Sequence, residues 1–311
     1  MLQAIETAYA QRDLKALDAL ARPTFRELNK KNDYKSVLML SCHNIKHLSK
    51  IATIEADCIM LNLEDGVSQE EKPFALVLCA IFLSQHKKCE KKLVVRVNSL
   101  DEGGFKEITY LNQFMPDAIR VPKIKTQEEV NAVLHLLHDD IELHLSIETA
   151  SAWINLQTLA VNKRITAFHL GILDLFADMG LSQSLIRLEN PTLHYMLSHF
   201  LITSLALGVK PISFIFQEFK DLQTFQAWLD LEKSMGYSAK GCISPAQAQL
   251  VNTIFVDTEQ EIKRAKTIVK LFEMHKEEGI SGFVDAEYGF IDEPIYKGAL
   301  SLLNKAIIKK N

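Results

Sequence analysis

Two segments decide the fold: Glu142-Leu-His-Leu-Ser-Ile-Glu148-Thr-Ala150 and Thr166-Ala-Phe-His-Leu-Gly171-Ile-Leu-Asp174-Leu175. Each predicts a short buried strand that turns directly into a helix, and each ends with a carboxylate, Glu148 or Asp174. Two carboxylates at the C-terminal ends of consecutive strand–helix units suit a hard divalent cation such as Mg²⁺, which keeps open positions for a substrate. Alternatively, both acidic residues only begin helices, where negative charge favours the helix dipole.

The same alternation of strand and helix extends over most of the chain. Short apolar runs predict strands over residues 36–41, 58–64, 93–98, 118–123, 142–148, 166–171, 211–216 and 240–244, each followed by a helical pattern. This strict alternation predicts an α/β protein, a parallel (β/α)8 TIM barrel. A doubly wound open sheet is the alternative, but no glycine-rich phosphate-binding sequence follows the first strand.

Two further segments flank the repeat. Residues 1–33 carry apolar side chains at helical spacing, which predicts an N-terminal helical arm that Pro23 interrupts. We assign residues 34–256 to the barrel domain and residues 257–311 to a C-terminal helical segment.

The composition excludes several other classes of protein. The chain of 311 residues has a net charge of −4, which argues against nucleic acid or an anionic membrane as a partner. Its five cysteines show no metal-binding spacing and indicate reduced thiols. The N-terminus has no apolar signal-peptide core, and the longest apolar run, residues 74–83, is too short to span a bilayer. We therefore expect a soluble cytoplasmic protein.

Polar side chains lie where the predicted strands meet their loops. These residues are Asn62, Glu64, Arg96, Asn98, Lys123, Glu148, Asp174 and Ser244. Catalytic groups of such barrels lie at the C-terminal ends of the strands, so we expect these side chains to converge on one mouth. Such a set is costly to bury without a ligand or metal, although an internal lattice of salt bridges is the alternative. His144 and His169 are interpreted as interior histidines rather than metal ligands.

Short motifs in order along the chain resemble one known family. They are Lys35-Ser-Val-Leu-Met-Leu40 with Asn44-Ile-Lys46, Leu61-Asn-Leu-Glu-Asp-Gly-Val67, Val95-Arg-Val-Asn98, Val121-Pro-Lys123, Ile147-Glu-Thr149, Leu170-Gly-Ile-Leu-Asp-Leu175 and Ile243-Ser-Pro-Ala-Gln247. From Lys35 to the C-terminus the chain resembles the citrate lyase β-subunit (CitE-like) branch of the HpcH/HpaI aldolase family. That branch includes malyl-CoA and citramalyl-CoA lyases.

The resemblance implies roles for particular residues. Glu148 and Asp174 match the two residues that hold Mg²⁺ in a (β/α)8 barrel. Arg96 matches the arginine that binds the keto-acid part of the substrate and stabilises developing negative charge. Lys35 and Lys46 match residues that help to hold coenzyme A.

The tail and the second strand complete the site that the resemblance implies. The C-terminal segment corresponds to a helical lid, in which Asp292 matches an acid–base residue that acts at a neighbouring subunit's site. A homotrimer or hexamer is therefore implied. An N-cap before the last helix is the other role open to Asp292. We add Glu64 as a catalytic candidate, and Asn62 and backbone N–H groups near Gly171 as substrate contacts.

Several positions depart from the family pattern. Asn62 and Ser213 replace aspartates, Ser244 replaces a histidine, Lys35 replaces an arginine, and Cys42 replaces a glycine. Lysine lacks the planar fork with which arginine binds phosphate. These changes motivate an alternative in which the barrel binds metal and CoA without turnover, as a regulatory or partner subunit.

Our leading hypothesis from the sequence is a Mg²⁺-dependent carbon–carbon lyase. It would cleave a short, carboxylated 3-hydroxyacyl-CoA of the citryl-, malyl- or citramalyl-CoA type to acetyl-CoA, or a similar thioester, and a 2-keto acid. Thioester hydrolysis and the reverse synthesis are closely related reactions. A metal-dependent aldolase acting on free keto acids is a further alternative, which would need no CoA-binding residues.

Overall fold

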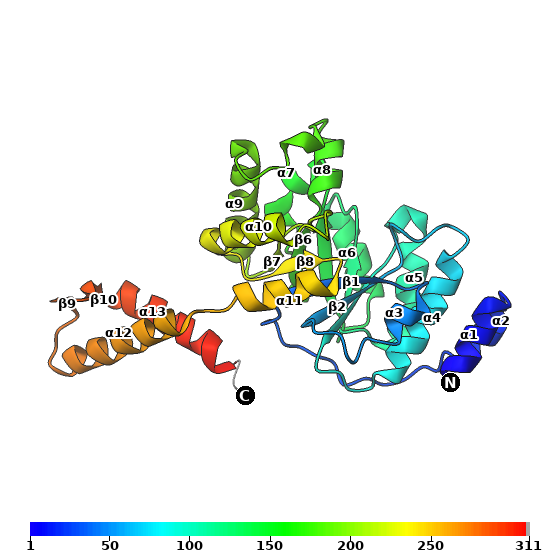
Figure 1. Ribbon diagram of the computed structural model, residues 1–311, viewed down its shortest axis with the longest axis horizontal. Helices are drawn as coiled ribbons and strands as arrows, with labels where there is room; N and C mark the ends of the chain where they lie inside the picture. The colour runs from blue at the N-terminus through cyan, green and yellow to red at the C-terminus, as the bar shows by residue number, and fades with distance from the viewer. Residues whose placement is uncertain (309–311) are drawn as a thin grey trace. The chain divides into compact units, whose positions relative to one another are not determined.

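The computed structural model describes residues 1–308. The chain divides into two compact units, residues 1–255 and a second unit that begins at Val256 (Figure 1). Each unit has a hydrophobic core of its own. In the part of the chain described, no helix is both long and apolar enough to cross a membrane.

Eight parallel strands form the centre of the first unit. They are β1 (Ser36–Ser41), β2 (Cys58–Asn62), β3 (Lys92–Arg96), β4 (Ala118–Val121), β5 (Glu142–Ile147), β6 (Ile165–Leu170), β7 (Lys210–Ile212) and β8 (Lys240–Cys242). Each pairs with its neighbour in sequence, except that β8 pairs with β1 rather than extending the sheet beyond β7. A bridge between Ser213 and Lys240 joins the two remaining edges. The predicted TIM barrel is therefore confirmed.

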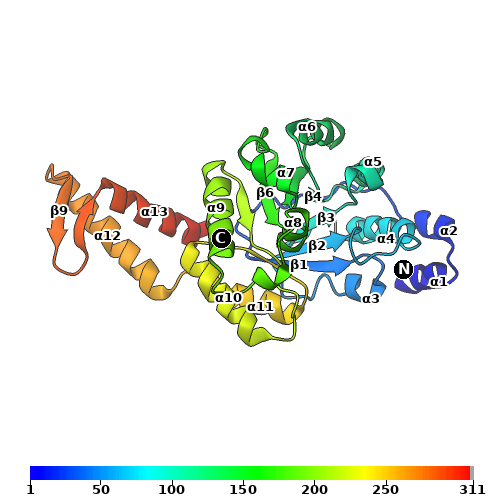
Figure 2. The same cartoon turned by 90° about the horizontal axis from the view of Figure 1, so that it is seen from above.

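Helices surround the strands, as the view from above shows (Figure 2). They are α3 (Ile45–Leu48), α4 (Lys72–Gln85), α5 (Gly104–Leu111), α6 (Gln127–Leu136), α7 (Ala150–Ile154), α8 (Ile172–Asp178), α9 (Pro191–Ala206), α10 (Leu222–Met235) and α11 (Pro245–Ile254). Local sequence explains where several of them start. Thr126 and Glu129 form a capping box at α6, and Asn190 followed by Pro191 opens α9.

The strands are buried on both faces, as parallel strands in such barrels are. One face packs with the surrounding helices in the main core. The other face forms a smaller cluster that includes Val37, Met60, Val94, Ala118 and Ile212. Because side chains alternate along a strand, this second set lies inside the barrel and leaves the strand ends for polar groups.

The N-terminal segment belongs to the same compact unit as the barrel. The sequence predicts helix up to residue 33, but the helices α1 (Leu2–Ala10) and α2 (Leu14–Asp18) end earlier, and residues 19–33 are not helical. The apolar stripe is real, because Ile5 and Leu17 are fully buried. Past Pro23 the chain is held differently: buried Arg26 donates to the carbonyl oxygen of Met115 at 2.7 Å.

The second unit is a helix, a hairpin and a helix. It contains α12 (Glu259–Glu277), the antiparallel strands β9 (Gly282–Asp285) and β10 (Gly289–Asp292), and α13 (Glu293–Ile308). Ile268, Phe272 and Ile291 are central to its core. Sequence periodicity predicts α12, which a Thr258–Glu261 capping box starts, but it does not predict the hairpin.

Candidate active site

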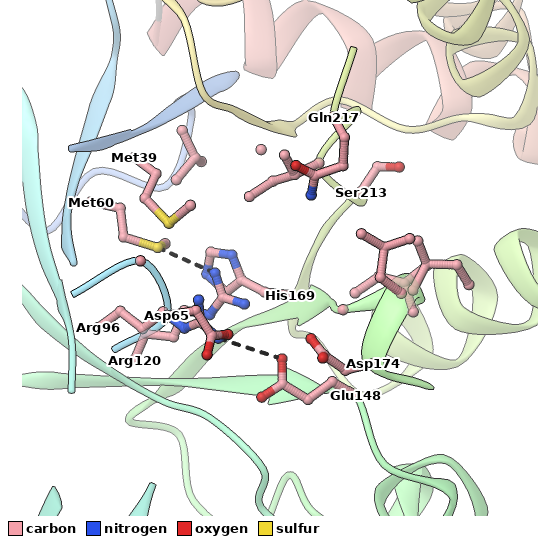
Figure 3. A pocket seen from close by; sticks show the side chains of 18 residues that line it. Met39, Met60, Asp65, Arg96, Arg120, Glu148, His169, Asp174, Ser213 and Gln217 are labelled. Atoms are coloured by element: carbon pink, nitrogen blue, oxygen red, sulfur yellow. Dashed lines mark hydrogen bonds and ion pairs between the residues drawn. The ribbon is translucent and has the colours of Figure 1, made fainter. Parts of the chain in front are cut away.

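A cavity of about 250 Å³ lies at the C-terminal ends of the barrel strands (Figure 3). Arg96 and Arg120 reach it from β3 and β4, Glu148 follows β5, and Asp174 lies in the first turn of α8. The remaining wall includes Met39, Met60, Asp65, His169, Gly171, Ser213 and Gln217. Of the eight polar residues expected at this mouth, Arg96, Glu148 and Asp174 line the cavity, and the other five do not.

Arg96 stands among three carboxylates. Its Nη2 atom contacts Glu64, lies 3.1 Å from Asp65 Oδ2, and lies 3.9 Å from Glu148 Oε2. Burial alone would lower the pKa of Arg96, but Glu148 and Glu64 raise it above its usual value. The guanidinium is thus held charged and fixed at the cavity wall.

Glu64 contacts Arg96 but does not line the cavity, and its side chain is 2% exposed. Burial raises the pKa of Glu64 to about 7, and Arg96 offsets only part of that rise. Lys123 Nζ lies 3.5 Å from its other oxygen. For the more exposed Asp65, burial alone would raise the pKa, but Arg96, Glu64 and Lys123 together hold the pKa of that carboxyl below its usual value.

The Glu148 carboxylate is positioned by two backbone features. Lys123 adopts a left-handed conformation with φ of 54°, and its N–H donates to Glu148 Oε1 at 2.8 Å. Such a conformation is uncommon for a non-glycine residue, so it marks a constrained turn. On the other side, a Cβ atom at Gly171 would lie 2.6 Å from Glu148 Oε2. Only glycine leaves room for the carboxylate in this position.

Of the backbone N–H groups near Gly171 that the sequence suggests as donors to the substrate, that of Gly171 itself is already engaged. Its own N–H donates to the carbonyl oxygen of Ile147 at 3.0 Å. The neighbouring Ile172 and Leu173 begin α8 beside the cavity, where the first N–H groups of a helix lack intrahelical partners. The contribution of Gly171 is therefore the space that it leaves for Glu148.

Glu148 and Asp174 lie next to one another at the edge of the cavity (Figure 3). They also border a second cavity of about 780 Å³, which Phe105, Lys123 and Lys125 help to line. No cluster of three or more histidine, cysteine, aspartate or glutamate side chains is arranged for a metal among the described residues. A pair of carboxylates beside open space suits Mg²⁺, which takes few protein ligands and keeps several waters, rather than a closed structural zinc site.

Sequence patterns alone do not identify Arg120. It lies on β4 opposite Arg96 of β3, and its side chain is 5% exposed. The available signal is a charged residue within an otherwise apolar predicted strand. Burial, together with nearby Arg96, lowers the pKa of Arg120 to about 9, so the guanidinium remains charged at pH 7.

The two strand histidines lie inside the barrel. His144 Nδ1 and His169 Nε2 are 3.2 Å apart, and both rings are buried. Burial lowers the pKa of each imidazole well below its usual value, and Lys92 or Arg120 adds to this effect. His169 lines the cavity as a neutral side chain, whereas His144 does not reach it.

Several predicted residues lie elsewhere. Lys35 precedes β1, at the opposite end of the barrel from the mouth, and its N–H donates to Asp57 Oδ2 at 2.7 Å. Lys46 lines a separate cavity of about 360 Å³ beside Tyr9 of the N-terminal segment. The structure therefore brings neither lysine to the walls of the main cavity.

The remaining predicted residues have structural partners. Asn62 is buried and donates to the carbonyl oxygen of Asp65 at 2.6 Å, which shapes the loop after β2. Ser244 caps α11 by accepting a hydrogen bond from the N–H of Gln247. Asp292 belongs to the second unit, where it ends β10 and accepts a hydrogen bond from the N–H of Ile295 at 3.1 Å.

Fold and site together define a barrel enzyme, with charged groups gathered where the loops follow the strands. Residues 35–245 match the HpcH/HpaI aldolase/citrate lyase family, so the chain belongs to this family, whose named members include carbon–carbon lyases. The resemblance drawn from the sequence motifs is confirmed.

Relatives of known activity cover most of the chain. A (3S)-malyl-CoA thioesterase of Cereibacter sphaeroides is 28% identical over 247 residues, which is 79% of this chain and 85% of the relative. Mitochondrial citramalyl-CoA lyase of Rattus norvegicus is 25% identical over 328 residues, covering 97% of this chain and 96% of the relative.

A solved structure has the same fold. CitE from Mycobacterium tuberculosis, in complex with magnesium, acetoacetate and coenzyme A, superimposes with a TM-score of 0.71 at 20% identity. The match covers 88% of this chain and 98% of that chain.

Proposed function

We propose that the protein is a Mg²⁺-dependent carbon–carbon lyase that cleaves a short, carboxylated 3-hydroxyacyl-CoA. Its products would be an acyl-CoA such as acetyl-CoA and a 2-keto acid, and citryl-CoA, malyl-CoA and citramalyl-CoA are the candidate substrates. The observation that carries the proposal is one cavity that combines buried Arg96 with the carboxylates of Glu148 and Asp174. A malyl-CoA thioesterase and a citramalyl-CoA lyase among the relatives support it, as does the CitE complex with magnesium and CoA.

Glu148 and Asp174 are the residues that would hold Mg²⁺ in this chain. The Lys123 N–H occupies Glu148 Oε1, and the space left by Gly171 accommodates Oε2. When bound, Mg²⁺ supplies a Lewis acid that stabilises negative charge on the oxygens of the keto acid.

Arg96 is suited to bind the carboxylate of the keto-acid half, because a guanidinium offers paired N–H donors to a carboxylate. The contacts with Glu64 and Asp65 hold it in one orientation. Glu64 does not line the cavity, so we assign it a positioning role through Arg96.

The cleavage itself has three requirements. The proton of the 3-hydroxyl group must leave, and the bond between C2 and C3 must break with its electron pair passing into the thioester enolate. That enolate must then be protonated at C2. The assignment of Asp292 as the acid–base residue stays a prediction, as do the homotrimer or hexamer and the cytoplasmic location.

The departures from the family pattern motivate the alternative that the barrel binds metal and CoA but does not catalyse a reaction. Asn62 and Ser244, two of the changed residues, do not line the cavity, and each is engaged in local hydrogen bonds. Ser213 does line it, but its hydroxyl group donates to Glu232 at 2.7 Å. The changed residues thus take part in the fold, while Arg96, Glu148 and Asp174 remain at the cavity.

The test is cleavage of citryl-CoA, malyl-CoA and citramalyl-CoA by the purified protein, with Mg²⁺ or with a chelator. Mass spectrometry separates the two reactions: a lyase releases acetyl-CoA and a keto acid, whereas a thioesterase releases free CoA and the hydroxy acid. We expect Mg²⁺-dependent release of acetyl-CoA that Glu148→Gln strongly reduces. Free CoA as the main product would show the thioesterase reaction instead. No turnover of any ester would overturn the proposal.

A further inference from the structure

The five buried cationic side chains of the described chain are not equally paired. Four of them have a carboxylate partner within ion-pair distance: Arg26 with Asp117, Lys92 with Glu142, Arg96 with Glu64 and Asp65, and Lys240 with Glu232. Arg120 is the exception, since it forms no ion pair with any residue that the structure describes.

The hydrogen bonds of Arg120 all go to neutral atoms. Its Nε atom donates to Ser146 Oγ at 2.8 Å, and its Nη1 atom contacts Met60 Sδ at 3.2 Å. Thioether sulfur is a weak acceptor. A charged guanidinium with only these partners is costly to bury, and its cost falls sharply when an anion binds beside it.

Arg120 also faces the cavity. It is the cross-strand neighbour of Arg96, and both side chains line the same walls, together with neutral His169 (Figure 3). The Arg96 guanidinium lies within ion-pair distance of carboxylates, whereas Arg120 meets the charges of Glu148, Glu64 and Asp174 only at longer range. One cavity therefore offers two arginines, of which one lacks a negative partner.

We propose that Arg120 binds a second carboxylate of the substrate's keto-acid half and determines specificity for it. This inference rests on the proposed function. Arg96 and the metal carboxylates serve the carboxylate next to the reacting carbonyl, and Arg120 serves the distal one. A substrate whose keto-acid product is a dicarboxylate fits this arrangement, and among the three candidates only citryl-CoA, which yields oxaloacetate, meets it.

The first experiment measures binding without turnover. Titration calorimetry of the full chain in Mg²⁺ compares freshly dissolved oxaloacetate with pyruvate, which lacks the distal carboxylate. We expect oxaloacetate to bind about 10- to 100-fold more tightly, the range of a charge-assisted hydrogen-bonded contact. Arg120→Met should remove this preference while leaving pyruvate binding nearly unchanged, and Arg120→Lys should keep part of it.

A matched control separates charge from packing. Ser146→Ala removes the neutral partner of Arg120 but keeps the guanidinium, so the preference for oxaloacetate should persist. Thermal unfolding of each variant checks that it folds. Equal binding of the two acids by the natural protein, or an equal loss of both in Arg120→Met, would overturn the inference.

The two proposals fail in different ways. If no ester is cleaved but oxaloacetate is preferred and Arg120→Met abolishes the preference, the carboxylate site stands and the lyase assignment falls. If malyl-CoA or citramalyl-CoA is cleaved as efficiently as citryl-CoA and the acids bind equally, the lyase stands and the role of Arg120 falls. Support for both requires kcat/KM for citryl-CoA to drop in Arg120→Met while that for citramalyl-CoA does not.

Discussion

The two ends of the barrel differ in how their buried charged side chains are paired. At the N-terminal ends of the strands each buried cation has its own carboxylate, in the pairs Lys92–Glu142 at 2.8 Å, Arg26–Asp117 at 3.5 Å and Lys240–Glu232 at 2.5 Å. At the C-terminal ends the charges are unevenly shared. Arg96 contacts more than one carboxylate, Arg120 has none among the described residues, and Glu148 and Asp174 face a cavity.

The difference distinguishes buried charges that are paired within the chain from charges that we expect to bind a ligand. A buried ion pair within the chain is satisfied without any other molecule, and breaking it leaves an uncompensated charge. We expect a charge at a cavity wall without such a partner to be paired by a bound ligand. Substitutions at the first end should therefore change stability, and those at the second should change binding and catalysis.

The largest effect is expected at the N-terminal end. Lys92→Met leaves the carboxylate of Glu142 buried beside an apolar side chain, so the free energy of unfolding should fall by about 3–5 kcal/mol. Activity per folded molecule should not change. Urea unfolding measures the first quantity. In the double variant Lys92→Met/Glu142→Leu most of the stability should return, and a single variant as stable as the natural protein would contradict the comparison.

The next effect concerns catalysis at the mouth. Glu148→Gln keeps an acceptor for the Lys123 N–H but removes the charge that Mg²⁺ requires. We expect kcat/KM to fall by about 10²–10³-fold, with little change in the urea midpoint. Calorimetric titration with Mg²⁺ should show weakened binding. Equal activity of this variant would remove Glu148 from the metal site.

Gly171→Ala tests the fit between backbone and carboxylate. The added methyl group would meet Glu148 Cβ at 2.5 Å, so we expect a loss of about 1–3 kcal/mol in stability together with weaker Mg²⁺ binding. Gly298→Ala in α13 is the matched control, since its added methyl group would meet nothing within 4 Å among the described residues, its chain neighbours and its own helix backbone aside. That control should be neutral or stabilising.

The smallest effect is a pH dependence at Glu64. Its pKa rises from 4.5 to about 7 on folding, so between these values the folded protein binds more protons than the unfolded chain. Stability from this group is complete below pH 4.5 and is lost progressively as pH rises through 7. Arg96, Asp65, Lys123 and Glu148 are the charged groups that face it.

The measurement for Glu64 is the difference in urea midpoint between the natural protein and Glu64→Gln across pH 4.5–8. Other buried carboxyls cancel in that difference. A difference that does not vary with pH would show that Glu64 keeps an ordinary pKa in the folded protein.

The fold was predictable because hydrophobic periodicity is a local property. All eight strands lie where the short apolar runs predict them, although β7 and β8 are three residues long. The helical prediction is wrong for residues 19–33 because apolar spacing continues there, while Pro23 and the buried Arg26 fix another path. The hairpin β9–β10 gives little signal in the sequence because its strands are short and partly exposed.

The site was predictable only in part, because distance across a barrel is not local. The prediction that polar residues at the C-terminal ends of the strands converge on one mouth is correct for Arg96, Glu148 and Asp174. Lys35 precedes its strand rather than following it, a position that places it at the other end of the barrel. Arg120 required the register between β3 and β4, which no single stretch of sequence contains.

At the seam where β7 meets β8 and the barrel closes, local opening of the backbone hydrogen bonds is coupled to ligand binding in the cavity. Ser213 supplies both backbone hydrogen bonds across it, donating to the carbonyl oxygen of Ala239 and accepting from the N–H of Gly241, each at 3.1 Å. The same residue lines the cavity, so any opening that exchanges these amide protons also dismantles a wall of the binding site. A bound keto acid should therefore slow deuterium uptake at the Ser213 and Gly241 amides, which makes the seam a reporter of ligand binding.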